Sequence, residues 1–476
     1  MLAGDTDPIA HALRMWQAEA ARREAEQDAP PRWTPYPKQE QARDLAGQVS
    51  ELLYGGAAGG GKSMFLRGYG VDFAVDHPAA HIGLVRRTLP MLKQTHGLHL
   101  SDLAGPDAIH NKAESTWTFP NGSVIRFISL TNPGDEQNYK SVEFDLLLFD
   151  EVTELTATQY TFMLTRRRSA RGYRAHSIAT ANPEGRGFRW VKQRWVKPRR
   201  EDLSPGQDLP RPCEAWSPPI IEDGQVVDHQ PTRAFIPATV FDNPGLIEAN
   251  PEYVRTLRSL PDSRLRKALL DGDWDAMDHV PGALWGQDLI DEHRVTAHPD
   301  LIRVVIAVDP SGSGADGADE AGVVAVGRAV NGHCYVLKDL SCVTDPDVWA
   351  ARTGAAYDLL NADCAVAEKN FGGEMVRSVL KHARPGMPIK LVTASRGKAI
   401  RAEPVAWLYR DGRVHHVGRY VELEDEQCTW TQDSGWSPGR MDALVWAVSD
   451  LMDLGQGSAW LDYLRQRKDE QDDQAG

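Results

Sequence analysis

A glycine-rich segment that runs directly into a lysine and a serine constrains this chain more than any other feature. Five of the seven residues 55–61 are glycine. Glycines let consecutive backbone N–H groups turn toward an anion, and the N-terminus of a helix adds positive partial charge. Apolar residues 52–54 predict a short strand before the loop, and residues 64–74 can form a helix after it. This context indicates that residues 56–63, G-x-x-x-x-G-K-S, form a phosphate-binding P-loop and not a linker that contains a lysine by chance.

The P-loop pattern assigns expected roles to its residues. Lys62 is expected to reach the β- and γ-phosphates of a nucleotide, and Ser63 is expected to ligate Mg²⁺. Gln39 lies shortly before the loop and is a candidate for recognising the adenine base, with an ordinary surface glutamine as the alternative. The expected nucleotide-contacting residues of the loop are Gly56, Ala57, Ala58, Gly59, Gly60, Gly61, Lys62 and Ser63.

A second apolar run ends in two acids, as the partner of a P-loop should. Residues 144–149 are mostly apolar, as in a buried parallel strand, and Asp150 and Glu151 follow them. Asp150 is placed to hold Mg²⁺ through water, and Glu151 to activate the water that attacks the γ-phosphate. A further apolar strand turns at Thr180, Asn182 and Pro183, and a polar residue at such a strand end can sense the γ-phosphate, with a simple Asn-Pro turn as the alternative. We therefore expect this half of the chain to bind and hydrolyse ATP.

Composition limits what the rest of the chain can be. Its 476 residues are enough for roughly three domains. Five cysteines without a C-x-x-C pair indicate neither a disulfide framework nor a zinc site, so reduced thiols inside a cell are expected. The sequence contains no apolar signal core and no run of membrane-spanning length. We therefore expect a cytoplasmic protein with no membrane partner.

Charge is unevenly distributed along the chain. The net charge of −14 argues against a general nucleic-acid binder, but a local basic surface can still contact DNA. Residues 164–200 contain twelve Lys or Arg and a single acid, Glu184. The stretch is either a phosphate-binding surface or an ordinary solvated face. Its arginines include Arg166, Arg167, Arg168, Arg171, Arg174, Arg186 and Arg189.

A new pattern of strands and helices begins at residue 301. The apolar run 301–309 ends in Asp309, and two further strands are joined by Asn-Gly at 331–332, a strong hairpin signal. Helices and strands then alternate; Glu368 ends the fourth strand, and Asp442 lies in the first turns of the closing helix. This order resembles the RNase H-like nuclease fold. The predicted fold class is α/β, with an N-terminal P-loop NTPase domain and a C-terminal RNase H-like nuclease domain.

The same order of elements can bring Asp309, Glu368 and Asp442 to one point. We expect no Lys or Arg among them, so that the three carboxylates would repel one another unless divalent metal lay between them. Two such ions can bind the attacking water and the leaving 3′-oxygen of a phosphodiester. Asp316 and Asp319, in the first hairpin loop, could add a ligand. The alternative for any one of these acids is a role in forming a turn.

The chain divides into five predicted segments, separated where the periodic pattern stops or restarts. They are an N-terminal helical arm (1–35), a P-loop ATPase domain (36–200), a Pro- and Asp-rich linker subdomain with a helix at 251–270 (201–295), an RNase H-like nuclease domain (296–460) and a charged tail (461–476).

A P-loop ATPase fused to such a nuclease resembles the large terminase subunit of tailed double-stranded DNA bacteriophages. The resemblance extends over nearly the whole chain, and its last three pieces are more diagnostic than the P-loop. The matching pieces are GGAAGGGKS, LLLFDE, TANP, VDPSG, VAEKNFGG, KAIRAEPVAWLYRDGRVHHVG and PGRMDAL.

The resemblance implies a viral genome-packaging motor. ATP hydrolysis would drive double-stranded viral DNA into a procapsid, and an endonuclease dependent on Mg²⁺, with Mn²⁺ also able to support it, would cut concatemeric DNA. By position, residues 56–63 would bind ATP and Glu151 would be the catalytic carboxylate, while Asp309, Glu368 and Asp442 would be catalytic and bind the metal. The implied setting is the host cytoplasm, with a homo-oligomeric ring on the portal protein and a small terminase subunit as partners.

A cation from a neighbouring subunit would complete each ATP site, and Arg86, Arg87, Arg126 and Lys140 are all candidates. Three alternatives to a packaging motor remain. A helicase- or transposase-type DNA-processing enzyme should carry further helicase motifs or a site-specific DNA-binding domain, and a Holliday-junction resolvase-like nuclease leaves the ATPase half unexplained. A non-enzymatic capsid or scaffold protein would predict damage at key site residues, which are intact.

Overall fold

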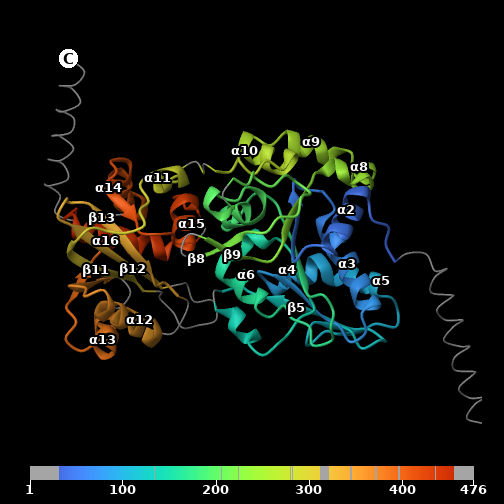
Figure 1. The fold of residues 1–476 in the computed structure, drawn as a ribbon, viewed down its shortest axis with the longest axis horizontal. Coiled ribbons are helices and arrows are strands. Elements are labelled where there is room, and N and C mark those ends of the chain that lie inside the picture. Colours follow the sequence, from blue (N-terminus) through green and yellow to red (C-terminus); the bar gives the residue numbers. More distant parts are fainter. Residues whose placement is uncertain are drawn as a thin grey trace, which may run out of the picture.

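The computed structural model describes residues 32–132, 134–204, 206–222, 225–278, 280, 282–310, 321–342, 346–369, 373–394, 397–434 and 436–454. They form two α/β bodies, each built around its own sheet, and Figure 1 shows the two bodies side by side. Residues 1–31 of the predicted arm, the predicted tail, and the candidate ligands Asp316 and Asp319 lie outside the described residues. None of the described helices has the length and apolar character needed to cross a membrane.

The first body is built on an eight-stranded sheet in the order β10-β1-β7-β6-β2-β5-β4-β3. The first six strands in that order run parallel, and β4 and β3 add an antiparallel edge. Because the carboxyl ends of parallel strands meet at one edge, the segments after β1, β6 and β7 lie together. The strands are β1 (Glu51–Gly56), β2 (His81–Arg86), β3 (Ile109–Asn111), β4 (Thr116–Thr118), β5 (Val124–Ser129), β6 (Leu146–Phe149), β7 (His176–Ala181) and β10 (Arg233–Ala238).

Helices cover both faces of this sheet, and the sequence of β1 explains why. Leu52 and Tyr54 point into one apolar core, whereas Leu53 points into a second core on the opposite face. Successive side chains of a strand alternate between faces, so a strand buried on both sides reads as a continuous apolar run. The covering helices are α2 (Pro37–Ala46), α3 (Lys62–Asp76), α4 (Leu89–Leu92), α5 (Leu98–Ala104), α6 (Ala157–Leu164) and α7 (Phe188–Val191).

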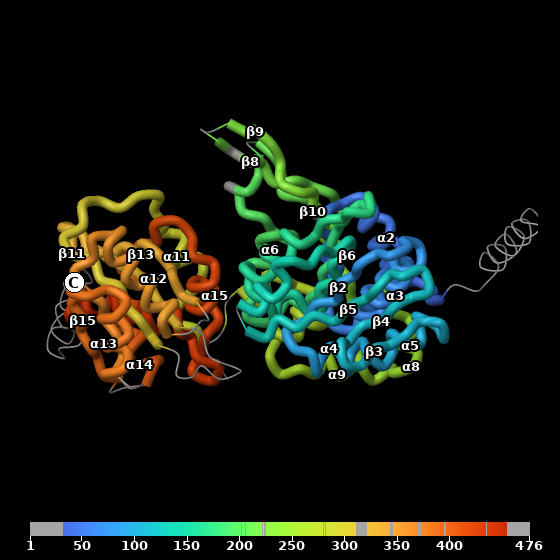
Figure 2. Tube along the Cα trace, turned by 90° about the horizontal axis from the view of Figure 1, so that it is seen from below, coloured from blue at the N-terminus to red at the C-terminus, as the bar shows by residue number. Residues whose placement is uncertain are grey.

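The stretch expected to be a linker subdomain, 201–295, contributes to both bodies. β10 pairs with β1 along its whole length and forms the edge of the first sheet. The predicted helix at 251–270 is broken into α9 (Glu252–Arg258), α10 (Ser263–Arg266) and a π-helical turn at Lys267–Asp271, because Pro261 interrupts it. Helix α8 (Pro244–Ala249) precedes these three helical pieces. Strands β8 (Pro219–Glu222) and β9 (Gln225–His229) form a separate hairpin, which projects from the body in Figure 2.

The second body has a six-stranded sheet in the order β15-β14-β11-β12-β13-β16. The hairpin-linked strands β11–β12–β13 are antiparallel, as expected, and β14 pairs parallel to β11. The short strand β16 was not predicted from the sequence. The strands are β11 (Leu301–Asp309), β12 (Gly322–Ala329), β13 (Cys334–Asp339), β14 (Cys364–Glu368), β15 (Ile389–Val392) and β16 (Val414–His416).

The helices of the second body place its last acid at the sheet. Helix α16 crosses β11 and β12 so closely that a Cβ on Gly322 would lie 1.9 Å from the carbonyl oxygen of Gly439. Only glycine at 322 lets the start of α16 approach the strand this closely. The helices are α11 (Gln287–Glu292), α12 (Pro346–Leu359), α13 (Gly373–Ala383), α14 (Lys398–Arg410), α15 (Val421–Thr429) and α16 (Gly439–Leu451).

The second body begins before residue 296, where the sequence predicted the start of the nuclease domain. A bridge joins Val295 to Val417, and Arg294 forms an ion pair with buried Glu424 on α15 at 2.6 Å. His416 of β16 lies 3.0 Å from the same carboxylate. Burial opposes ionisation of Glu424, but His416 and Arg294 outweigh it and hold its pKa well below the usual range. Residues 287–295 are thus fixed to the second body.

Candidate active sites

The P-loop follows β1 in a conformation that requires its glycines. Gly56, Gly59 and Gly61 have φ angles of 127°, 76° and 73°, in the region that side chains disfavour. The loop carbonyls face the protein, because Asn243 donates to Gly59 O at 2.9 Å and Gln39 donates to Gly61 O at 3.0 Å. Within the described part of the chain, the N–H groups of residues 59–61 have no hydrogen-bond partner. Such unpaired donors at the start of α3, whose first turn also holds Ser63, fit an anion.

Lys62 is buried at the start of α3 and points back across the loop. Its Nζ donates to Ala57 O at 2.6 Å and to Asn182 Oδ1 at 2.7 Å. Burial lowers the pKa of Lys62, and the charges of Glu151 and Asp150 oppose that shift. Asn182 therefore links the P-loop to the strand end of β7, at the place where the sequence predicted a sensor of the γ-phosphate.

Both carboxylate oxygens of Asp150 contact side chains of the protein. Arg86 Nη1 and His96 Nε2 each lie 3.0 Å from Oδ2, and Thr180 Oγ1 donates to Oδ1 at 3.1 Å. Burial opposes ionisation, but His96 and Arg86 outweigh it and hold the pKa of Asp150 below its ordinary value. Arg86 is thus engaged within its own chain, which counts against it as the cation supplied by a neighbour. The partner His96 was missed, since nothing in the sequence marks it.

Glu151 differs from Asp150 in its backbone conformation and in the direction of its pKa shift. Its φ of 49° lies in the left-handed region, and its Oε2 accepts from Asn182 N–H at 3.4 Å. Burial and the charge of Asp150 raise the pKa of Glu151 to about 7, although Lys62 opposes the shift. A carboxylate with that pKa is suited to accept a proton near neutral pH. The structure therefore brings Lys62, Asn182 and Glu151 together.

Gln39 of α2, Ala58 of the loop and Gly272, which was not predicted, complete the surroundings of the P-loop. Gln39 is buried, and its Oε1 accepts from Tyr36 N–H at 2.9 Å while its amide holds Gly61, so it lies on the loop backbone. Ala58 N–H donates to Leu269 O at 2.7 Å. Gly272, with a φ of 69°, follows that turn, and a Cβ there would lie 2.8 Å from Ala57 N.

The second centre lies where β11 and β14 end beside α16. The parallel pairing of Val308 with Ala367 places Asp309 next to Glu368, and the first turn of α16 brings Asp442 to both. Burial and the charge of Asp442 raise the pKa of Asp309 to about 7. Among the described residues, the Asp309 carboxylate has no hydrogen-bond or ion-pair partner. The three predicted acids are therefore together.

The expectation that no Lys or Arg lies among these acids is wrong. Lys398 forms an ion pair with Asp442 Oδ2, and Arg401 lies 3.4 Å from both Glu368 Oε2 and Asp442 Oδ1. Both cations come from the first turn of α14, three residues apart and thus on one face of the helix. These two cations neutralise part of the carboxylate charge, which we had expected divalent metal alone to neutralise.

The donor types of this centre fit a divalent ion, because carboxylate oxygens are the ligands that Mg²⁺ and Mn²⁺ prefer. The three carboxylates are not arranged to bind such an ion in this structure. Within the described ranges, no three His, Cys, Asp or Glu side chains are arranged to bind a metal ion. Lys398 and Arg401 supply the neutralising charge in this arrangement.

Much of the basic stretch 164–200 is engaged inside the first body. Arg171 pairs with buried Asp145 at 3.1 Å, Arg167 donates to Ser50 O at 2.6 Å, and Arg194 makes two bonds to buried Glu51. Arg168 is more exposed and pairs with Glu143 at 3.4 Å. The stretch is therefore neither a continuous phosphate-binding surface nor a simple solvated face.

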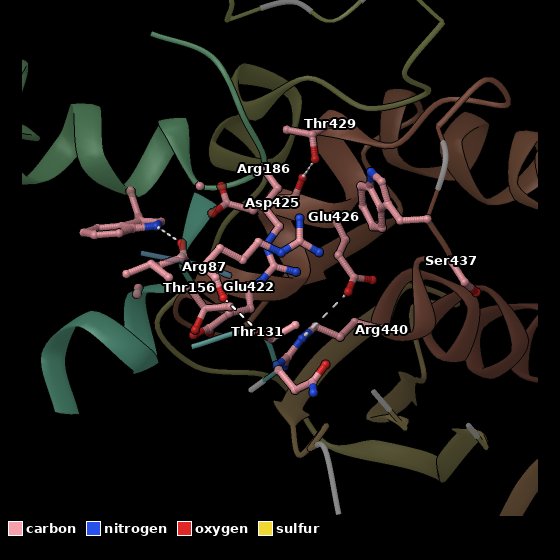
Figure 3. A pocket seen from close by; sticks show the side chains of 16 residues that line it. Arg87, Thr131, Thr156, Arg186, Glu422, Asp425, Glu426, Thr429, Ser437 and Arg440 are labelled. Carbon is pink, nitrogen blue, oxygen red and sulfur yellow. Dashed lines mark hydrogen bonds and ion pairs between the residues drawn. The ribbon is translucent and has the colours of Figure 1, made fainter. Parts of the chain in front are cut away.

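A cavity of about 160 Å³ lies between the two bodies. Figure 3 shows Arg87 and Arg186 of the first body facing Glu422 and Asp425 of α15 across it. Nearby, Thr158 Oγ1 donates to Glu422 Oε1 at 2.5 Å. Burial raises the pKa of Asp425 well above its ordinary value. The contact between the bodies is thus centred on α15 and combines these charged side chains with an apolar one, Val421, which packs against a core of the first body.

Comparisons with known proteins agree with the two bodies. Residues 86–291 match the family model of the T4likevirus-type terminase large subunit, N-terminal, and residues 306–451 match that of the terminase RNaseH-like domain. No curated protein matches the chain.

Solved structures with a similar fold include the large terminases of a thermophilic bacteriophage and of bacteriophage HK97. The protein of the thermophilic phage has 13% identity and a TM-score of 0.39, covering 88% of this chain and 99% of its own. The HK97 protein has 11% identity and a TM-score of 0.39, covering 88% and 95%. A nuclease domain of the large terminase subunit gp2 of bacterial virus Sf6 has 15% identity and a TM-score of 0.25, covering 34% and 96%.

The family models match in the order of the two bodies and together span most of the chain, from the end of β2 to the end of α16. The chain belongs to the bacteriophage large terminase subunit family, with an N-terminal ATPase domain and a C-terminal RNase H-like nuclease domain.

Proposed function

We propose that this chain is the motor subunit of viral genome packaging, which translocates double-stranded DNA into a procapsid by ATP hydrolysis and cuts concatemeric DNA. The observation that carries the proposal is the presence of two separate carboxylate centres on one chain. One joins Glu151 to Lys62 through Asn182, and the other groups Asp309 with Glu368 and Asp442. A chain with both can hydrolyse a nucleotide and a phosphodiester independently.

At the first centre, the unpaired N–H groups of residues 59–61 would bind the β- and γ-phosphates of ATP, with Lys62 neutralising their charge. Glu151 would accept the proton of the attacking water, for which a pKa of about 7 suits it. Asn182 touches both Lys62 and Glu151, so a change in the γ-phosphate would reach the end of β7. Ser63 would ligate Mg²⁺, and we retain Gln39 as the adenine contact and Asp150 as a water-mediated Mg²⁺ ligand.

At the second centre, Asp309, Glu368 and Asp442 would hold divalent ions, Mg²⁺ or Mn²⁺. When bound, such ions supply a nucleophile at neutral pH and stabilise the leaving 3′-oxygen. Arg401 holds Glu368 and Asp442 at a fixed separation. The large terminase of the thermophilic phage was solved in complex with ATP-gamma-S and with ADP, and the Sf6 domain with manganese; we propose that this chain takes the same kinds of ligand.

The proposal includes partners and domain limits. We expect a homo-oligomeric ring on the portal protein, a small terminase subunit that selects DNA, and action in the host cytoplasm. Arg87, Arg126 and Lys140 remain candidates for the cation supplied by a neighbouring subunit. We propose an ATPase domain that includes β10 and continues through residue 272, and a nuclease domain that begins at α11.

The test is a DNA-stimulated ATPase assay beside a plasmid-cleavage assay with Mg²⁺ or Mn²⁺, both on the purified full chain. Lys62→Ala should abolish ATP hydrolysis and leave cleavage intact, whereas Asp309→Asn should abolish cleavage and leave hydrolysis intact. Asp309→Asn keeps the size of the side chain and removes its negative charge. A wild-type chain inactive in both assays, or a substitution that stops the other reaction, would contradict the proposal.

A further inference from the structure

The two cations of the nuclease centre are held in different ways, although they leave the same helical turn. Lys398 and Arg401 both contact Asp442, whose side chain is 2% exposed. Their separation of three residues directs both toward the start of α16. The other contacts of each side chain decide which of the two can detach from Asp442.

Arg401 is fixed. Its side chain is 11% exposed, its guanidinium lies 4.4 Å from the centroid of the Trp446 ring, and it contacts both Glu368 and Asp442. The indole N–H of Trp446 donates to the same Glu368 Oε2 at 3.1 Å. A planar guanidinium stacked on a ring and shared between two acids is a pre-organised positioning group.

Lys398 is held by fewer contacts. Its side chain is 35% exposed, and its ammonium touches Asp442 and the Ser437 hydroxyl, the latter at 2.7 Å. An ammonium on a four-carbon stem is a compact charge that can swing into solvent without disturbing the backbone. The oxygen of Asp442 that it occupies is one that a metal ion would need.

We propose that Lys398 is a built-in counter-ion of the nuclease centre, which must leave Asp442 before a divalent ion binds there, while Arg401 stays in place. The inference rests on the proposed nuclease function and deepens it. Among the described residues Asp309 makes no direct ion pair, and Lys398 and Arg401 act on it only through their charge, so its carboxylate is open to an incoming ion. The affinity of the resting centre for metal is lowered by the free energy needed to detach the lysine.

The chain contains a matched control pair in the same body. Lys390 pairs with Asp450 at 2.5 Å, and Asp450 is 2% exposed and also contacts Arg303 at 2.6 Å. This arrangement repeats the one at Asp442, with one lysine and one arginine on a buried aspartate, but it lies outside the carboxylate centre. Lys390→Gln therefore removes the same charge from an equivalent pair.

The test is a Mn²⁺ titration of the full chain without nucleotide or DNA, in which free Mn²⁺ is measured by electron paramagnetic resonance. Removing one ion pair of this kind should tighten Mn²⁺ binding in Lys398→Gln by about fivefold. Lys398→Arg, which keeps the charge, and Lys390→Gln should both bind Mn²⁺ like the wild type. Unchanged or weaker binding in Lys398→Gln would overturn the proposal, as would equal tightening in Lys390→Gln.

A further variant separates this inference from the function on which it rests. Asp442→Asn should abolish the Mn²⁺ binding seen in the wild type. If it does so while Lys398→Gln binds no more tightly, the counter-ion role is wrong and the metal centre stands. If the wild type binds no Mn²⁺, or Asp442→Asn binds it equally well, both the metal centre and the counter-ion role are wrong. Calorimetric unfolding of the second body reports whether each variant is folded, because all these substitutions lie there.

Discussion

At the scale of single residues, the two acids that end β6 differ in the environment of their carboxylates. Asp150 is surrounded by donors that favour its ionised form, whereas Glu151 has a buried carboxylate beside another negative charge. Two neighbouring carboxyl groups with opposite pKa shifts can take different roles. Under our proposal, Glu151, whose pKa is raised, accepts the proton.

ATP hydrolysis should therefore depend on pH through Glu151. Its pKa of about 7 means that the carboxyl is protonated, and unable to accept a proton, at lower pH. We expect kcat of the DNA-stimulated ATPase to rise about eightfold from pH 5.5 to 6.5 and to level off above about pH 8. Glu151→Gln should lower kcat by about 10²–10⁴-fold and remove this dependence. A kcat independent of pH between 5.5 and 8 would rule out this assignment.

The sequence predicted the acids of both centres better than their partners. Asp309 and Glu368 could be predicted because each ends an apolar strand, and strand ends follow from periodicity. Lys398 could not, since it lies 44 residues before Asp442 and meets it only through the orientation of α14. The assumption of bare carboxylates failed because no local pattern reveals which helix will face a strand end.

At the scale of elements, regular apolar runs were predicted well and short or interrupted ones were not. β11 agrees with its expected range, 301–309, because its side chains pack against helices. β16 has only three residues, and β10 contains Pro237, which a strand between two neighbours would not tolerate. As the edge strand of the first sheet, β10 can contain it.

The turn after the π-helical segment 267–271 should be needed for the shape of the P-loop. At Gly272 a side chain would combine a left-handed backbone with a contact of 2.8 Å to Ala57 N. We expect Gly272→Ala to lower the free energy of unfolding by about 1–2 kcal/mol for the backbone and by about 1–3 kcal/mol more for overpacking. It should also weaken binding of a fluorescent ATP analogue.

Gly172 provides the control for this substitution. Its φ of 81° is also left-handed, but a Cβ there would meet nothing within 4 Å. Gly172→Ala should therefore show the backbone effect alone and bind the analogue like the wild type. Equal losses of analogue binding in the two variants would mean that the contact with the P-loop is unimportant. Chemical denaturation and fluorescence titration measure both effects.

The basic stretch should divide into DNA-binding and structural arginines. Arg168 is 56% exposed, so Arg168→Ala should reduce the slope of log affinity against log salt for DNA by about one. Arg171 pairs with buried Asp145, so Arg171→Ala should instead destabilise the first body by about 1–3 kcal/mol and leave the slope unchanged. Filter binding across salt concentrations distinguishes the two; an unchanged slope in Arg168→Ala would show that this side chain contacts no phosphate.

At the scale of the whole molecule, each body has its own apolar cores, and the two bodies meet through α15. Two cores lie on the faces of the first sheet and two on those of the second. Between the bodies lie the contact of Thr158 with Glu422 and a cavity lined by both charged and apolar side chains, and Val421 of α15 packs against a core of the first body. Charged and hydrated contacts contribute little stability compared with a buried core. Each body should therefore fold and unfold largely on its own.

Calorimetry of the full chain should accordingly show two unfolding transitions. Mg²⁺ with ADP binds only the first body under our proposal, so it should raise the midpoint of one transition, and Mn²⁺ without nucleotide should raise the other. Lys62→Ala should remove the first shift because it no longer binds the nucleotide. Asp442→Asn should remove the second because it no longer binds Mn²⁺. Thr158→Ala, which removes a hydrogen bond between the bodies, should leave both midpoints within about 2 °C of the wild type. A single transition that both ligands raise would mean that α15 joins the two bodies into one cooperative unit, and that the contact between them is far stronger than its chemistry indicates.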